Sequence, residues 1–368
     1  MIQYFMYKFV LICGKIHFGR RIGVITVFKK TLKALGKILV SGIIAFIILT
    51  LFCCIYYNVP VHSANNDGST DYKWEPNVFY SQGTEGFAWG KMNNDGFTNL
   101  FDYNDDTTVD VLVMGSSQME ARQVGMSQST AGRLNTLLEN DTVYNIGVSG
   151  HTFLTCASNL SSALNKYHPT KYVVIGTSSL SFSDEAITLA INEETPEIAS
   201  NDEGFIGLLQ KNPCLRLMYH QIKNYTKLQA GGTEELEDFE TPVTTDTKTE
   251  TDIATNEKLL ADLLNKMSTL AEEHSVKVII MHDPAINISS DGSINFSTTQ
   301  NTTTKFQKLC NDNGILFLDM SARFKAEYET NHVLPYGFSN SPVGSGHLNK
   351  FGHAMISDEL YNLILEED

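Results

Sequence analysis

Residues 109–121, VDVLVMGSSQMEA, run from an apolar, β-branched stretch directly into a glycine and two serines. Such a stretch is typical of a strand that is buried on both faces of a sheet. Similar stretches recur at 142–147, 171–176, 277–283 and 315–320, and helical patterns lie between them. This alternation predicts an α/β fold, with a parallel sheet and helices on both of its faces.

Helices are expected where apolar side chains recur at helical spacing, at 153–167, 259–270, 303–313 and 350–365. One segment breaks the rhythm. A parallel crossover needs about a dozen residues, but residues 184–276 separate the third predicted strand from the fourth. The middle of this segment, around 229–254, is strongly acidic and has little apolar content. This composition predicts a mobile, solvated insertion.

The charge of the chain is unevenly distributed. Residues 1–37 hold eight Lys and Arg and no acid, so all 42 Asp and Glu lie beyond them, beside the other 19 basic residues. Residues 38–57, ILVSGIIAFIILTLFCCIYY, then follow without a charge. A helix of this length, at 1.5 Å per residue, crosses the hydrocarbon core of about 30 Å. Cations before a span keep that end in the cytoplasm, so the sequence predicts a single-pass anchor with an extracytoplasmic body.

A buried core helix and a cleaved signal peptide are the alternatives for this segment, and residues 61–63 are small enough for a cleavage site. The basic region and the apolar run are both long for a signal peptide, which favours an uncleaved anchor. The predicted organisation is a basic cytoplasmic segment at 1–37, a transmembrane helix at 38–57, a stalk at 58–75 and a domain at 76–368. Because that domain is acidic, we expect no nucleic-acid partner.

Polar residues follow the predicted strands. Ser116 and Ser117 follow the first strand, NIGVSGHT (145–152) the second, and GTSSLSFSD (176–184) the third, while SGHLNKFGH (345–353) opens the last helix. The carboxyl ends of parallel strands line the ligand crevice of such a sheet. We therefore expect these residues to lie near one another.

A serine hydroxyl attacks an acyl group only when a base takes its proton and donors hold the oxyanion. Ser117 is the candidate nucleophile and His347 the candidate base, with the backbone N–H groups of Ser117 and Gly150 as oxyanion donors. The plainer alternative is a simple turn after a strand and a histidine that caps a helix. The sequence has no Gly-rich phosphate loop and no metal-ligand spacing, so we expect neither a cofactor nor a metal ion.

The order of these segments resembles the SGNH (GDSL-type) hydrolase superfamily, from about residue 109 to the end. Its first block, Gly-Asp-Ser, corresponds to GSS at 115–117. Its second, Asn-x-Gly-x-x-Gly, matches NIGVSG at 145–150, and its last, Asp-x-x-His-Leu-Asn, matches HLN at 347–349. The resemblance implies a flavodoxin-like sheet and ester or acyl chemistry, with Ser117 as nucleophile and Gly150 in the oxyanion hole.

Two positions depart from the family pattern. In the third block, Gly-x-Asn-Asp, Ser178 stands where an asparagine donates to the oxyanion, and Gly344 stands where an acid precedes the histidine. Asp319, at the end of the fifth strand, or a backbone carbonyl could orient His347 instead. The other options are a Ser–His dyad and a degenerate site that only binds.

Outward-facing, membrane-anchored members of this superfamily resemble acyltransferases of cell-envelope polymers. Residues 85–99, EGFAWGKMNNDGFTN, are similar to an element that precedes the first block in such proteins, and they also fit an aromatic-rich turn packed on the sheet. We predict an extracytoplasmic serine esterase or O-acyltransferase that acts on acyl esters of envelope polysaccharide. The alternative is a silent carbohydrate-binding or scaffold domain, partner to a membrane-bound acyltransferase.

Overall fold

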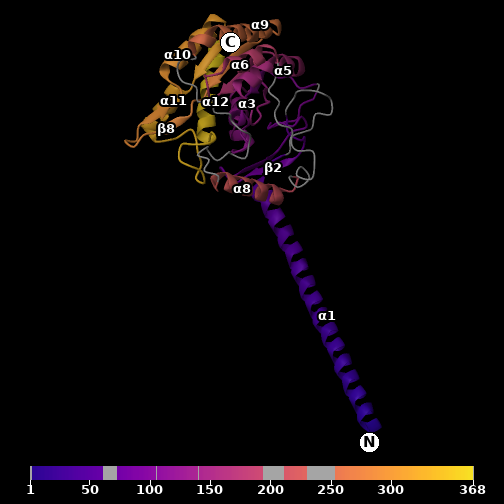
Figure 1. Cartoon of the computed structure of the whole chain (residues 1–368). Helices are drawn as coiled ribbons and strands as arrows, with labels where there is room; N and C mark the ends of the chain where they lie inside the picture. Colours follow the sequence, from indigo (N-terminus) through magenta and orange to yellow (C-terminus); the bar gives the residue numbers. More distant parts are fainter. Residues whose placement is uncertain are drawn as a thin grey trace. The chain divides into compact units, whose positions relative to one another are not determined.

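A computed structural model describes residues 2–60, 73–104, 106–139, 141–193, 211–229 and 253–367 (Figure 1). The chain divides into two compact units, Met1–Cys53 and Cys54–Asp368. Most of the predicted stalk and nearly all of the predicted acidic insertion lie outside the described residues.

The first unit belongs to helix α1 (Ile2–Tyr56). Its segment Lys29–Tyr56 has a mean hydropathy of 3.0 in its most apolar window, of which only 6% is buried. A helix with this length and composition fits the predicted membrane span and fits a signal sequence as well.

The second unit contains the predicted five-stranded sheet. All five strands are parallel and are ordered β10-β7-β6-β4-β5. The strands are β4 (Val111–Met114), β5 (Val143–Asn145), β6 (Tyr172–Thr177), β7 (Lys277–His282) and β10 (Leu316–Asp319). In sequence order this is the flavodoxin-like arrangement 2-1-3-4-5, so the predicted fold class is confirmed.

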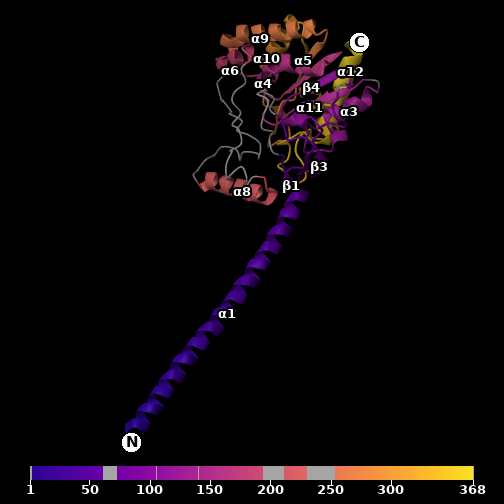
Figure 2. The ribbon, with the colours of Figure 1, turned by 90° about the vertical axis from the view of Figure 1, so that its right-hand side faces the viewer.

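Helices cover both faces of the sheet because alternate strand residues point to opposite sides. In β4, Leu112 and Met114 join one hydrophobic cluster, while Val111 and Val113 join the other. The first face packs against α4 (Phe153–Ser158), α5 (Leu160–Tyr167), α6 (Asp184–Ile191), α9 (Ile253–Glu273) and α10 (Gln300–Asp312). The second packs against α3 (Thr130–Leu137), α11 (Ser321–Asn331) and α12 (Lys350–Glu367) (Figure 2).

The structure also contains elements that the sequence pattern did not predict. A three-stranded antiparallel sheet is formed by β1 (Tyr57–Asn58), β2 (Phe79–Gln82) and β3 (Ala88–Lys91), and a hairpin by β8 (Ile286–Ile288) and β9 (Ile294–Phe296). The helix expected at 153–167 is two helices that meet at Asn159, a residue type that favours helix ends. Strand β1 occupies the predicted junction of span and stalk.

Candidate active site

The Gly-Ser-Ser stretch forms a tight turn from β4 into the short helix α2 (Ser117–Glu120). A side chain on Gly115 would put its Cβ 2.5 Å from Met119 Cγ, so only glycine fits there. Ser116 is the N-cap, and its hydroxyl accepts the N–H of Gln118 at 3.3 Å. Ser117 is therefore the first helical residue, half-buried at the carboxyl end of β4. This is the point where the strand order reverses, the usual position of a ligand crevice.

The second block packs against α2. The Asn145 side-chain amide donates to the Met119 carbonyl at 2.9 Å, and its oxygen accepts the Gly147 N–H at 2.9 Å. A Cβ on Gly147 would lie 2.8 Å from the Glu120 nitrogen. Gly150, at the end of the block, is exposed and has a φ of +88°, a conformation that favours glycine.

A buried carboxylate ties the Gly150 loop to α2. Glu120 accepts the backbone N–H of Ser149 at 3.2 Å and pairs with Arg122 Nε at 3.1 Å. It also accepts hydrogen bonds from the Trp74 indole and the Ser149 hydroxyl. Because Glu120 is on the same short helix as Ser117, it fixes the Gly150 loop relative to that serine.

His347 is held by Glu85, which comes from the turn between β2 and β3. Glu85 Oε2 lies 2.6 Å from His347 Nδ1, and Oε1 accepts the His347 backbone N–H at 2.6 Å. Burial alone would raise the pKa of Glu85, but the hydrogen bonds and charge of His347 bring it below its ordinary value. Glu85 is therefore ionised at neutral pH, so Nδ1 carries a proton and Nε2 is the accepting nitrogen of the neutral ring.

The backbone around His347 is shaped for this contact. Gly346 has a φ of +86°, and a Cβ there would lie 2.1 Å from Glu85 Oε1. Asn340, from the loop before His347, donates to the carbonyls of Gly83 and Gly86 at 2.9 Å each and accepts the Gly86 N–H at 2.8 Å. The turn that carries Glu85 is thus joined to the His347 loop on both sides.

Gln118 joins the Ser117 turn to the His347 loop. Its side-chain oxygen accepts the Leu348 N–H at 2.7 Å, and its amide donates to the Gly346 carbonyl at 3.4 Å. The residue after Ser117 therefore bonds to both neighbours of His347. The structure brings these two segments together, although they are some 230 positions apart in the chain.

Asp319 and Ser178 lie at the predicted strand ends, but each hydrogen-bonds to a residue other than Ser117 or His347. Asp319 Oδ1 pairs with His282 Nδ1 at 2.8 Å, its register partner on β7, so the structure does not place Asp319 at His347. With strands about 4.8 Å apart, the edge strand β10 lies about 14 Å from β4. Ser178 follows β6 as expected, but its hydroxyl donates to Asp283 Oδ1 at 3.1 Å.

Asp283 is a buried acid at the same end of the sheet. Burial raises its pKa to about 7, against opposing hydrogen bonds from Ser178 and Tyr336. A raised carboxyl pKa stabilises the fold below the unfolded value near 4 and loses that contribution as the pH rises through 7. Asp283→Asn should therefore gain stability relative to wild type between pH 4 and pH 8, by about 4 kcal/mol. Urea unfolding at both pH values measures this, and a pH-independent difference would contradict it.

The other histidines of this region have structural partners. His353 Nδ1 accepts the Thr130 N–H at 3.2 Å and so caps α3, and burial lowers its pKa to about 3. His282 is fully buried between Asp319 and Thr298. Burial also lowers the pKa of His151 to about 4. The rings of His151 and His353 therefore stay neutral at physiological pH.

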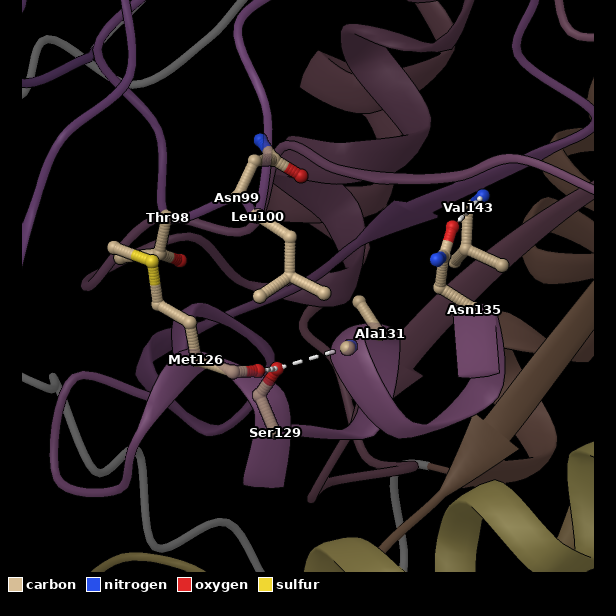
Figure 3. Close-up of a pocket in the computed structure, with 9 residues that line it drawn as sticks. Thr98, Asn99, Leu100, Met126, Ser129, Ala131, Asn135 and Val143 are labelled. Atoms are coloured by element: carbon tan, nitrogen blue, oxygen red, sulfur yellow. Dashed lines mark hydrogen bonds between the residues drawn. The ribbon is translucent and has the colours of Figure 1, made fainter. Parts of the chain in front are cut away.

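A small pocket near the start of β5 lies against the 98–100 segment (Figure 3). Ser129, in its lining, accepts the Gly132 N–H at 3.1 Å and donates to the Met126 carbonyl at 2.7 Å. None of its lining residues is titratable. The pocket therefore supplies no acid or base for chemistry.

Glu85 is the site residue that sequence reasoning missed. It begins the segment 85–99, for which the sequence left open a likeness to a family element and an aromatic-rich turn packed on the sheet. The structure shows the packing, since Asn99 exchanges two hydrogen bonds of 2.8 Å with the Asn145 backbone and Asn93 donates to the Tyr144 hydroxyl at 2.7 Å. The available sequence signal was only an acid followed by glycine, Glu85-Gly86.

No protein-family model and no curated protein sequence matches the chain. Several solved structures are similar to part of the chain. A protein described as a candidate SGNH hydrolase from Slackia heliotrinireducens is 12% identical, with a TM-score of 0.35 over 70% of this chain and 98% of that one. The acetyl xylan esterase AlAXEase is 14% identical (TM-score 0.38, 69% and 98%), and the psychrotrophic esterase EstA from Pseudoalteromonas sp. is 16% identical (0.33, 70% and 96%).

The five strands have the flavodoxin-like order, and the family's blocks lie at the carboxyl ends of β4 and β5 and at the start of α12. The Ser117 turn and the His347 loop are bonded to each other through Gln118. In strand order and in the placement of these blocks, the chain is similar to the SGNH hydrolase superfamily.

Proposed function

We propose that the protein is a serine esterase or O-acyltransferase, with Ser117 as nucleophile, His347 as general base and Glu85 as the acid that orients His347. The observation that carries this proposal is the hydrogen bond of 2.6 Å between Glu85 and His347 Nδ1, in a loop bonded to the Ser117 turn. In the family pattern the orienting acid stands three residues before the histidine, where this chain has Gly344, and Glu85 would take that role. In this proposal Ser117, His347 and Glu85 form a Ser–His–Glu triad, in which Glu85 takes the orienting role that the sequence left open between a backbone carbonyl and Asp319.

The chemistry follows from these contacts. Ser117 Oγ attacks the acyl carbonyl carbon while His347 Nε2 takes its proton, and Glu85 stabilises the imidazolium that forms. The backbone N–H groups of Ser117 and Gly150 hold the oxyanion. The C–O bond to the leaving alcohol then breaks, and the imidazolium returns the proton to that alcohol. Water or a polysaccharide hydroxyl attacks the resulting acyl-enzyme and regenerates Ser117.

We further propose that α1 anchors the protein in a membrane, with a cytoplasmic N-terminus and an extracytoplasmic body. The apolar segment Lys29–Tyr56 and the excess of cations before residue 38 support this orientation. An enzyme so placed meets acyl esters of cell-envelope polysaccharide, the substrate class that the resemblance implies. A membrane-bound acyltransferase is the partner that would supply acyl groups for transfer.

A fluorophosphonate probe tests the proposed nucleophile. We expect wild-type protein to be labelled covalently and Ser117→Ala to remain unlabelled, because the probe reacts only with an activated serine. Ser116→Ala is the matched control, since the Ser116 hydroxyl already accepts the Gln118 N–H as a cap, and it should keep its labelling. Equal labelling of wild type and Ser117→Ala would contradict the proposal.

One contact favours the alternative of a silent binding domain. The Ser178 hydroxyl, which stands at the family's third oxyanion donor, donates to Asp283. If wild type shows neither labelling nor turnover of p-nitrophenyl acetate, while binding to acetylated glycan survives both Ser117→Ala and His347→Ala, the domain binds carbohydrate without catalysis.

A further inference from the structure

Helix α8 (Pro213–Gln229) presents large apolar side chains to solvent. Met218 and Ile222 are 53% and 61% exposed, and Tyr219 beside them is 41% exposed. Positions i, i+1 and i+4 lie on one side of a helix. The same helix buries Cys214 and packs Leu217 against a cluster that contains Tyr57 and Val59. One side of α8 thus packs against the protein, and another side exposes apolar side chains to solvent.

The charge of this segment is opposite to that of the body around it. Residues 211–229 contain Lys211, Arg216, Lys223 and Lys227 and no Asp or Glu. The chain beyond residue 37 holds 42 acids against 19 bases. An anionic surface repels a body with this excess of acids. The segment without acids is therefore the part of the body that can approach such a surface. A basic helix with an apolar side is the usual form of a helix that lies in a lipid interface.

The position of α8 in the fold also indicates a lipid surface as its partner. Arg216 donates to the backbone carbonyl of Val59, and Leu217 contacts the cluster of Tyr57 and Val59. Strand β1 begins at Tyr57, directly after α1 ends at Tyr56. Figure 2 draws α8 beside β1. If α1 spans the membrane, these are the residues that emerge from it, and α8 packs within about one helix diameter, roughly 10 Å, of that point.

We propose that α8 lies in the headgroup region of the membrane that α1 spans, where Met218 and Ile222 enter the apolar layer and the positive charge of residues 211–229 attracts anionic lipid. This inference rests on the anchoring stated under the proposed function. The occupant is a lipid surface, because it combines an apolar layer with negative charge beside the end of a span. A lipid-bound α8 gives the body a second attachment and restricts its rotation about the anchor.

Photocrosslinking in the full-length chain tests the proposal. A diazirine amino acid is placed at Ile222, at Ile44 in α1, or at Leu365 in α12, which are 61%, 53% and 54% exposed. The protein is reconstituted in vesicles of phosphatidylcholine, alone or with phosphatidylglycerol. We expect lipid adducts at positions 44 and 222 and none at 365. The adduct at 222 should increase with phosphatidylglycerol, and Lys223→Gln/Lys227→Gln should lower it by up to about fivefold per cation.

The outcomes separate the two proposals. One outcome is lipid adducts at position 44 but either no adduct or a protein adduct at position 222. It would overturn the role of α8 and leave the membrane anchoring by α1 supported. Equal adduct yields at 222 and 365 would overturn it as well. Absence of lipid adducts at 44 would refute the anchoring, and the inference on α8 would then survive only if the adduct at 222 persisted.

Discussion

Glu85→Gln is expected to lower kcat for ester hydrolysis by about 10³–10⁴-fold with little change in KM. The Glu85 carboxylate accepts hydrogen bonds from both the backbone N–H and Nδ1 of His347. A glutamine amide that accepts from the backbone turns its NH₂ group toward Nδ1, which moves the ring proton to Nε2. The ring then cannot take the proton of Ser117, and the corresponding change in a serine protease triad costs about 10⁴ in rate.

Asp319→Asn is the matched control for this variant. It makes the same acid-to-amide change at the carboxylate that pairs with His282 instead of His347, so kcat should stay within about threefold of wild type. Initial rates with p-nitrophenyl acetate, over a range of substrate concentrations, separate kcat from KM. Glu85→Gln with more than a tenth of wild-type kcat, or a larger loss in Asp319→Asn, would show that Glu85 does not orient the base.

The sheet and the serine turn could be predicted because their signals are local. Each buried strand is a short apolar run. The contacts that require glycine at 115 and asparagine at 145 lie within a few residues of Ser117 or within one block. The contact between Glu85 and His347 joins positions 262 residues apart. It depends on β2 and β3, whose four-residue strands FYSQ and AWGK show no apolar alternation, so no sequence period indicated that the turn exists.

Asp319 shows that prediction from the sequence is also limited for a residue on a correctly predicted strand. Its position at the end of a predicted strand was correct, since β10 ends there. Its neighbour depends on the strand order, and β10 lies at the edge, with β7 and β6 between it and β4. The strand pattern along the chain does not contain that order. A residue can therefore be placed at the correct end of the sheet and still be several strands away from the group it was expected to hold.

Glu120→Ala is expected to lower the free energy of unfolding by about 3–5 kcal/mol, the cost of removing one partner of a buried ion pair. The side chains of Glu120 and Arg122 are each 1% exposed, and they pair at 3.1 Å. The Arg122 guanidinium, stacked on Trp74 at 4.6 Å, would lose its carboxylate partner. The Ser149 N–H and the Trp74 indole would lose their acceptor too. Urea denaturation, followed by circular dichroism, measures the loss.

An exposed ion pair provides the contrast for Glu120→Ala. Lys308 and Asp312 pair on the surface of α10, with side chains 73% and 52% exposed, and Asp312→Ala should cost less than about 0.5 kcal/mol. A loss below about 1 kcal/mol in Glu120→Ala would show that this carboxylate is not what holds α2. Glu120 also fixes the Ser149 peptide before Gly150. Glu120→Ala should therefore have a reduced kcat at temperatures where it is fully folded, because one oxyanion donor is no longer held opposite Ser117.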